Sequence, residues 1–408
     1  MLFDCAVIGL GLIGSAAARY LSTTGLTTLA LGPAEPDHWE THKGVFASHY
    51  DAGRITRILD KDLVWATLAA RSIAEYPVIE AKSGIQFHHP VGLLRIGAVA
   101  DDPEDSLDQT AAVGQALQVD FTELNPDEMA QHFPFLQLPS TTGGLWERGD
   151  AGAINPRALV QAQLKLAATQ GAMVVRETAV SLERNGAVYT IVSDQGQRYQ
   201  ATKVLLAAGA WSGSLLARPL ALDRQLRTVA LAQVSAQEVE RLRALPSLIY
   251  RLDRDPEVSS VYSNPPLPYP DGRWCLKIGG MLHNHYRAET TAAIGEWFRK
   301  GGDPQEVAAL RRILLSILPD LQVTQWGSKP CVITNTATDY PYIDQLDENL
   351  FVATGGCGAA AKSSNEIGRL GALLTEKGTW TDALPKDKFA ASFMADEAAF
   401  GPARRLYR

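Results

Sequence analysis

The sequence predicts an α/β protein: one domain with a parallel sheet, assembled from separated segments, and an inserted second domain of α+β type with a mostly antiparallel sheet. Three observations lead to this prediction. A short apolar strand at residues 3–8 is followed by a glycine turn and an alanine-rich helix. Strands and helices of the same kind return between 159 and 208 and again from 350. A proline-rich stretch between 245 and 273 instead indicates short strands joined by loops.

The first glycine turn has the spacing GxGxxG, with Gly9, Gly11 and Gly14 between the strand at 3–8 and a helix at 15–21. In this context the first glycine permits a tight turn, the second lets backbone N–H groups approach a pyrophosphate, and the third lets helix and strand pack closely. The helix N-terminus adds partial positive charge. We therefore expect a Rossmann-like domain that binds a dinucleotide, although the motif alone does not separate FAD from NAD.

The second strand of this unit, at 27–31, lacks the acidic residue that usually follows the motif by about 20 residues and holds a ribose hydroxyl. The next positions are Gly32 and Pro33. Glu35 could reach back to the ribose, or a backbone group or water could replace the carboxylate. The expected pyrophosphate contact does not depend on this residue.

The remaining elements predict how the two domains divide the chain. A helix is expected at 159–168, strands at 172–175, 190–192, 203–208 and 350–353, and, after a second glycine turn at 355–358, a helix from about 364. We assign residues 1–86, 150–222 and 323–408 to the dinucleotide-binding domain, and residues 87–149 and 223–322 to the substrate domain.

Composition excludes several other classes of protein. The 408 residues are enough for two packed domains, and the net charge of -7 with scattered basic residues is not that of a nucleic-acid binder. No apolar run is long enough to span a bilayer. Cys5, Cys275, Cys331 and Cys357 have neither metal-ligand spacing nor the density of a disulfide scaffold. We expect a cytoplasmic protein, monomer or homodimer, without nucleic-acid or membrane partners.

Several stretches, distributed over nearly the whole chain, together resemble the D-amino-acid-oxidase-like FAD-dependent oxidoreductases, and within them monomeric sarcosine oxidase and the N-methyl amino acid oxidases. They are the glycine motif, Ser-His-Tyr-Asp-Ala-Gly-Arg-Ile-Thr-Arg at 48–57, Ala-Ala-Gly-Ala-Trp at 207–211, Cys-Leu-Lys-Ile-Gly at 275–279, and Cys-Val-Ile-Thr-Asn-Thr at 331–336 continuing to 355–362. The resemblance implies FAD as the cofactor and a small amine or amino acid as the substrate.

The resemblance assigns roles to three cations. Arg57 would grip the substrate carboxylate, since a guanidinium holds a carboxylate through two hydrogen bonds, and Lys362 would complete the grip next to the flavin. Arg54 would lie nearer the flavin. Without the resemblance, the preferred interpretation would be two exposed arginines on a polar turn and a solvated lysine near a helix start.

Lys277 and Tyr262 are the other catalytic candidates. Lys277 lies in an apolar stretch, 274–278, where a solvated lysine would be unusual. The resemblance places the matching lysine over the flavin, where a buried cation promotes the reaction of reduced flavin with oxygen. The alternative is an edge-strand lysine whose charged end lies in water. Tyr262 matches a tyrosine of the substrate pocket.

The resemblance also indicates residues that hold the cofactor. Cys331 would carry the flavin through a thioether to its 8-methyl group, with Lys329 or one of the arginines favouring the thiolate. The other cysteines are expected to be small buried hydrophobes. Further cofactor contacts are expected from Ser48, Gly355, Gly356, Gly358 and Lys362, in addition to the first glycine motif.

Some positions depart from the sarcosine oxidase pattern. Gly280 and Met281 stand where a histidine would follow Lys277, and three alanines, 359–361, precede Lys362. These small side chains favour a substrate larger than sarcosine. His49 is expected to be structural or solvated.

The expected reaction is hydride transfer from the C–H next to nitrogen to the flavin, hydrolysis of the imine, and reoxidation by O2 with release of H2O2. One alternative is an amine dehydrogenase of the same fold that passes electrons to a quinone or a partner protein. Another is a flavin-binding subunit that relays electrons in a larger complex, and the glycine motif alone also permits a nicotinamide-linked dehydrogenase.

Overall fold

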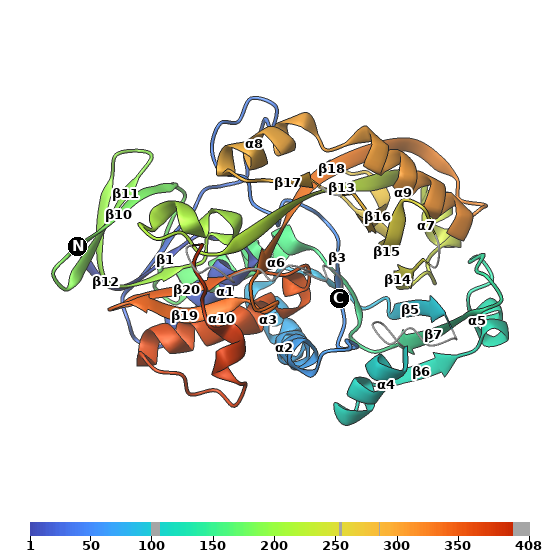
Figure 1. Ribbon diagram of the computed structural model, residues 1–408, viewed down its shortest axis with the longest axis horizontal. Helices are drawn as coiled ribbons and strands as arrows, with labels where there is room; N and C mark the ends of the chain where they lie inside the picture. The colour runs from blue at the N-terminus through green and yellow to red at the C-terminus, as the bar shows by residue number, and fades with distance from the viewer. Residues whose placement is uncertain (99–106, 253–254, 285, 395–408) are drawn as a thin grey trace.

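The computed structural model describes residues 1–98, 107–252, 255–284 and 286–394. It contains two large sheets, which occupy the left and right halves of the view in Figure 1. This arrangement confirms the predicted fold class, a Rossmann-like domain from discontinuous segments with a mostly antiparallel insertion.

The first sheet has the strand order β10-β11-β12-β1-β2-β9, with β20 beside β12 and β19 beside β20. Its parallel strands are β1 (Leu2–Ile8), β2 (Thr28–Leu31), β9 (Met173–Val175), β12 (Arg198–Leu206) and β20 (Leu350–Thr354). Antiparallel strands extend it at β10 (Ala179–Asn185), β11 (Val188–Ser193) and β19 (Tyr342–Asp347).

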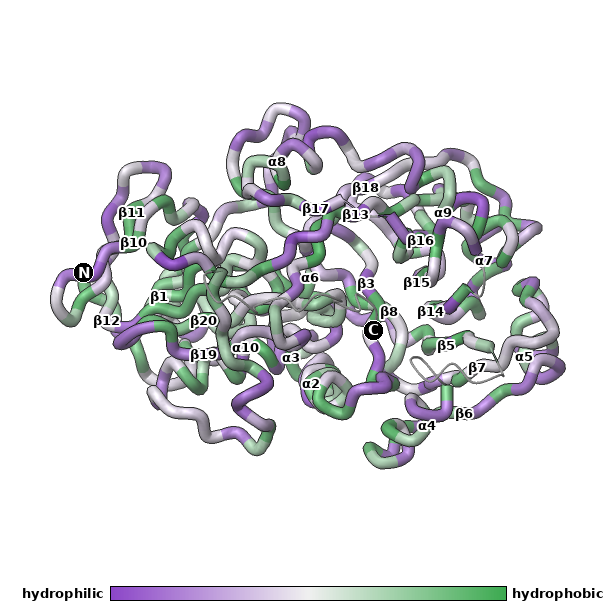
Figure 2. Tube along the Cα trace, in the orientation of Figure 1, coloured by the Kyte–Doolittle hydropathy of each residue, from purple (hydrophilic) through white to green (hydrophobic). Residues whose placement is uncertain are grey.

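The strands of this sheet are apolar on both faces, and helices cover one of these faces. Cys5 and Val7 of β1 face the helices, whereas Ala6 and Ile8 join a second cluster on the other face. Figure 2 shows that the residues of β1 and β20 are mostly hydrophobic. The helices are α1 (Leu12–Leu21), α2 (Leu63–Ala74), α3 (Tyr76–Ser83), α6 (Pro156–Thr169) and α10 (Ala360–Lys377).

The second sheet has the order β17-β13-β16-β15-β14-β5-β7-β6 and is antiparallel except for the β14–β5 pair. Its strands are β5 (Leu93–Ala98), β6 (Phe121–Leu124), β7 (Thr142–Glu147), β13 (Leu222–Val234), β14 (Ser247–Arg251), β15 (Val258–Pro268), β16 (Trp274–Leu282) and β17 (Tyr286–Arg287). Its apolar face packs on α9. The helices of this part are α4 (Leu107–Ala116), α5 (Pro126–His132), α7 (Ala236–Arg241), α8 (Thr291–Lys300) and α9 (Pro304–Ile317).

The domain boundary expected at residue 323 does not coincide with the hydrogen-bonding pattern of the two sheets. Strand β18 (Val323–Thr336) pairs antiparallel with β13 from Val234↔Val323 to Leu222↔Thr336. The returning chain therefore belongs to the second sheet as far as Thr336, because β13 offers it an unpaired edge. Residues 395–408 of the same expected segment lie outside the described residues. The rest of the division into domains stays a prediction.

A small third sheet joins β3 (Arg54–Thr56), β8 (Gly152–Ile154) and β4 (His88–His89). It holds the segment with the predicted arginines against the chain that leads into and out of β5–β7. Two short 3-10 helices, η1 (Gly209–Leu215) and η2 (Lys386–Phe389), complete the described elements.

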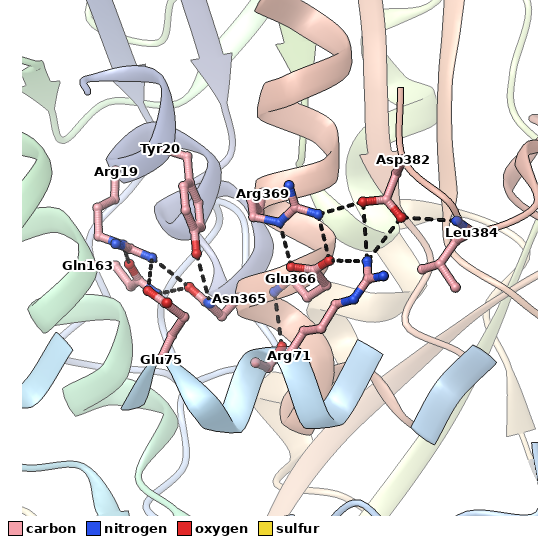
Figure 3. A network of polar contacts seen from close by, with 11 residues as sticks. Arg19, Tyr20, Arg71, Glu75, Gln163, Asn365, Glu366, Arg369, Asp382 and Leu384 are labelled. Atoms are coloured by element: carbon pink, nitrogen blue, oxygen red, sulfur yellow. Dashed lines mark hydrogen bonds and ion pairs between the residues drawn. The ribbon is translucent and has the colours of Figure 1, made fainter. Parts of the chain in front are cut away.

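A polar network fixes α10 to α2 (Figure 3). Glu366 of α10 binds Arg71 of α2 at 3.0 Å and Arg369 at 2.7 Å, and both arginines also bind Asp382. A second group links Arg19 of α1 to α6 and α10. These contacts matter for function because α10 carries Lys362. None of the described helices has the length and apolar character needed to cross a membrane.

Candidate active site

A cavity of about 480 Å³ lies between the two sheets. It extends from the first glycine turn, through the second glycine turn, to side chains of β13–β16. The cavity therefore lies beyond the carboxyl ends of β1 and β2, where open α/β sheets bind their ligands.

The first glycine turn fits a dinucleotide. Gly9 has φ +100°, a conformation that disfavours other residues, and a Cβ there would lie 2.6 Å from the Ala207 carbonyl oxygen. A Cβ on Gly11 would meet only His49 Nδ1, at 3.7 Å, so the loop is open to a ligand. Helix α1 begins at Leu12 without a side-chain cap, which leaves its first N–H groups for a pyrophosphate.

The end of β2 shows why the usual acidic residue is missing. A Cβ on Gly32 would lie 2.7 Å from the backbone nitrogen of Leu10, so a carboxylate side chain does not fit. Glu35, the expected substitute, accepts two hydrogen bonds of 2.6 Å from Arg157. Its contact with the ribose stays a prediction.

His49 lines the cavity, where the sequence suggested only a structural or solvated residue. Its Nδ1 is buried and has no hydrogen-bond partner in the described part of the chain. Burial, together with Arg157, Arg176 and Arg54, lowers the pKa of His49 to about 3, so the ring is neutral. A neutral imidazole beside Gly11 offers the dinucleotide a hydrogen bond. The feature of the sequence that could have indicated His49 is its position beside Ser48 in the segment 48–57.

The second glycine turn also lines the cavity, through Gly355, Gly356 and Gly358. Gly355 has φ +87°, and a Cβ there would overlap the Thr336 side chain. Helix α10 begins at Ala360, earlier than the expected start near 364, so Lys362 lies in its first turn. The turn and helix start together deliver Lys362 to the cavity wall.

Cys331, on β18, lies beside Arg54. Its Sγ accepts a hydrogen bond of 3.3 Å from Arg54 Nη2, which also donates to the Ser48 carbonyl oxygen at 2.9 Å. Ser48 Oγ donates to the Val332 carbonyl oxygen at 3.2 Å. Arg54 is therefore the cation at the sulfur, whereas the Lys329 ammonium lies 4.5 Å over the Trp39 ring.

Lys277 is 1% exposed and donates to Asp51 Oδ2 at 2.8 Å and to the Gly53 carbonyl oxygen. It does not itself line the cavity; Tyr262, whose ring centre is 5.6 Å from its Nζ, does. Burial lowers the pKa of Lys277 to about 8, although Asp51 opposes this. Burial acts to raise the pKa of Asp51, but Lys277 and Arg54 outweigh burial and hold this pKa well below its usual range. Sequence reasoning missed Asp51, which lies in the quoted segment 48–57.

Arg57 and Lys362 lie on the same side of the cavity, as predicted, and are bridged by a residue that the sequence did not indicate. Asp60 Oδ2 lies 3.1 Å from Arg57 Nη1 and 3.1 Å from Lys362 Nζ. Burial lowers the pKa of Lys362 to about 8, with Asp60 acting against it. Burial acts to raise the pKa of Asp60, but Lys362 and Arg57 outweigh burial and hold this pKa well below its usual range.

Asp60 accepts a hydrogen bond from only one nitrogen of the Arg57 guanidinium, Nη1. Its Nε is buried and has no hydrogen-bond partner among the described residues. A buried donor without a protein partner is uncommon in folded proteins, so this nitrogen is available to donate to a ligand or to water. Burial also raises the pKa of Tyr262 to about 12, so this wall contributes a neutral phenol. Small residues Gly280 and Ala359–Ala361 line the same space, as the sequence suggested.

A dinucleotide cradle that opens onto a buried group of cations defines a dinucleotide-dependent oxidoreductase. Comparison with known proteins gives the family. The FAD-dependent oxidoreductase family model matches residues 4–374, and the chain belongs to this family. It is therefore an FAD-dependent oxidoreductase, and the first glycine turn with the uncapped start of α1 fits the pyrophosphate of this cofactor.

Three relatives illustrate the similarity. The chain is 28% identical to a monomeric sarcosine oxidase of Streptomyces avermitilis, over 92% of this chain and 94% of the relative. It is 24% identical to an N-methyl-L-tryptophan oxidase of Yersinia pestis, over 92% and 95%. The solved structure of NikD, an unusual amino acid oxidase essential for nikkomycin biosynthesis, has a TM-score of 0.74 and 20% identity, covering 96% of this chain and 98% of that one.

Proposed function

We propose that this protein is an FAD-dependent oxidase of a small secondary amine or amino acid. The observation that carries the proposal is the buried Arg57 Nε, which has no partner in the described part of the chain and lies beside Lys362 at the cavity wall. The similarity to sarcosine and N-methyl-L-tryptophan oxidases supports an amine as the group that is oxidised.

FAD, when bound, supplies the acceptor for the hydride from the C–H next to nitrogen. The chain's own contribution is position and electrostatics. Arg57 and Lys362 bind the polar group attached to the reacting carbon, which orients the C–H. Tyr262, as a neutral phenol, borders the same space without adding charge. Water then hydrolyses the imine product.

We assign the oxygen step to the cations around Cys331. Lys277 and Arg54 provide buried positive charge that stabilises negative charge developing on O2, which becomes H2O2. Arg54 donates a hydrogen bond to the Cys331 sulfur, and we propose that this sulfur forms the thioether to the flavin. The new S–C bond would replace the thiol S–H bond and one C–H bond of the 8-methyl group, with O2 taking up the two electrons and two protons as H2O2.

The test is to mix the purified yellow protein without oxygen with a panel of N-methyl amino acids, cyclic imino acids and larger secondary amines. Loss of the oxidised flavin band on mixing, followed by peroxide formation on admitting air, supports the proposal. Flavin reduction with slow peroxide formation and rapid turnover with a quinone favours the dehydrogenase alternative. Failure of every amine and amino acid to reduce the flavin contradicts the proposed function.

A further inference from the structure

Asp60 occupies the place between Arg57 and Lys362 where the sequence predicts a substrate carboxylate. One carboxylate oxygen bridges the two cations at 3.1 Å each, and the other accepts the backbone N–H of Asp62 at 3.2 Å. The side chain is buried and lines the cavity. The chain itself therefore supplies a carboxylate to this pair of cations.

A second buried carboxylate lies close to the same pair. Glu147 of β7 is 2% exposed, and its two oxygens accept the backbone N–H groups of Ile58 and Leu59 at 2.8 and 2.9 Å. Both oxygens act as acceptors, as those of an ionised carboxylate do. Burial raises the pKa of Glu147, and Arg57 and Lys362 act against that rise. Asp60 and Glu147 thus place two buried carboxylates beside this pair of cations before any substrate binds.

We propose that the substrate is a secondary amine whose carbon next to nitrogen carries a neutral hydrogen-bond acceptor, such as an amide carbonyl or a hydroxyl, in place of a free carboxylate, and that Asp60 sets this preference. The inference rests on the proposed function and specifies its substrate class.

Two nitrogens of the Arg57 guanidinium differ in their contacts. Its Nη1 donates to Asp60, whereas its buried Nε has no partner among the described residues and needs an acceptor. A substrate carboxylate there would bring a second negative charge next to Asp60 in a site shielded from water, where like charges repel strongly. A neutral oxygen satisfies the Nε donor without that repulsion.

The cavity wall also carries other arginines. Arg95, Arg227 and Arg251 line the cavity, and each has a partner of its own. Arg95 also acts on Asp60 and helps to keep it ionised. The ionised carboxylate of Asp60 therefore remains next to the place that a substrate carboxylate would occupy.

The first test compares matched substrates with the flavin-loaded wild-type protein. The pairs are N-methylglycine and its amide, proline and its amide, and N-methyltryptophan and its amide, each followed by anaerobic flavin reduction. We expect the amides to reduce the flavin at least about tenfold more efficiently than the acids. Equal or greater efficiency with the acids overturns the proposal but leaves the proposed function in place, since the flavin is still reduced. If neither member of any pair reduces the flavin, the proposed function fails first.

The second test changes the charge of Asp60. Asp60→Asn should shift the ratio of acid to amide efficiency toward the acid by about tenfold or more. Asp271→Asn removes an exposed carboxylate that pairs with Arg273, and should leave the ratio unchanged. An unchanged ratio in Asp60→Asn overturns the assignment of preference to Asp60.

A binding measurement covers the case in which Asp60→Asn does not fold. Acetate and acetamide are titrated into the wild-type protein, and binding is followed by the change in the flavin absorption spectrum. Tighter binding of acetamide supports the proposal. Tighter binding of acetate overturns it.

Discussion

At the scale of single residues, the contact between Arg54 and Cys331 leads to the sharpest prediction. Because the cation lies 3.3 Å from the sulfur, we expect a flavin attached at Cys331. Acid precipitation of the yellow protein should leave the colour in the pellet, and Cys331→Ala should release it into the supernatant. Cys357→Ala is the control, since Cys357 also lines the cavity and should retain colour. Colour in the wild-type supernatant would contradict the linkage.

Arg57 gives a prediction for substrate binding. Arg57→Ala removes the donor at Nε and leaves Asp60 with Lys362 as its remaining close cation. We expect KM for the amine or amino acid substrate to rise by an amount equivalent to about 2 to 5 kcal/mol, with flavin retained. Arg57→Lys keeps the charge but not the planar group, and should recover little of the loss. Steady-state kinetics checks both, and an unchanged KM would remove Arg57 from the substrate site.

The buried Lys277 gives a prediction that depends on pH. A lysine is a cation below its pKa, and burial lowers the pKa of Lys277 to about 8. Reoxidation of reduced flavin by O2 should therefore be fast below pH 8 and slow as the pH rises through that value. In stopped-flow measurements, Lys277→Met should slow this half-reaction at all pH values and abolish its pH dependence.

A control separates the role of Lys277 in the oxygen step from its role in folding. Lys277→Met leaves the buried carboxylate of Asp51 without its partner at 2.8 Å, so it should also lower the free energy of unfolding. The double variant Asp51→Asn with Lys277→Met should regain stability but not the oxygen reaction. If reduction by substrate and oxidation by O2 slow equally, Lys277 positions substrate instead.

At the scale of elements, helix α10 connects the polar network of Figure 3 to the site. Glu366, about one turn after Lys362 in α10, is 2% exposed and holds Arg71 of α2 and Arg369 of α10. Glu366→Gln should lower the free energy of unfolding by about 1 to 3 kcal/mol, because the three partly buried, charge-assisted hydrogen bonds to Arg71 and Arg369 weaken. Chemical denaturation checks this. The control is Glu348→Gln, an exposed partner of Arg184, which should have little effect.

The elements also show what local sequence could predict. Both glycine turns and the strands around them follow from short patterns, whereas the resemblance to the family is what suggested that Arg57, Lys362 and Cys331 lie at the site. The pairing of Asp60 with Lys362 does not, because it depends on the small third sheet and the start of α10 coming together. The pairing of β18 with β13 was missed for the same reason: long-range register leaves no local signal.

At the scale of the whole molecule, apolar periodicity, glycine spacing and the proline-rich stretch predicted two kinds of sheet, one mostly parallel and one mostly antiparallel. What the sequence could not predict is which charges meet between them. Asp51, Asp60 and Glu147 all lie in buried positions next to cations, and only the assembled fold brings the carboxylates of β7 and of the segment after β3 to one point.

The β13–β18 pairing has a consequence for rebuilding this enzyme. Within the second sheet, β13 pairs with β16, where Leu231 is opposite Lys277, and with β18, where Arg227 is opposite Cys331. One strand thus sets the distance between Lys277 and the Cys331 sulfur. A chimera that imports a foreign substrate domain must therefore transfer β13, β16 and β18 as one block. Grafts that divide this block would shift the two groups relative to each other even when both parents fold well.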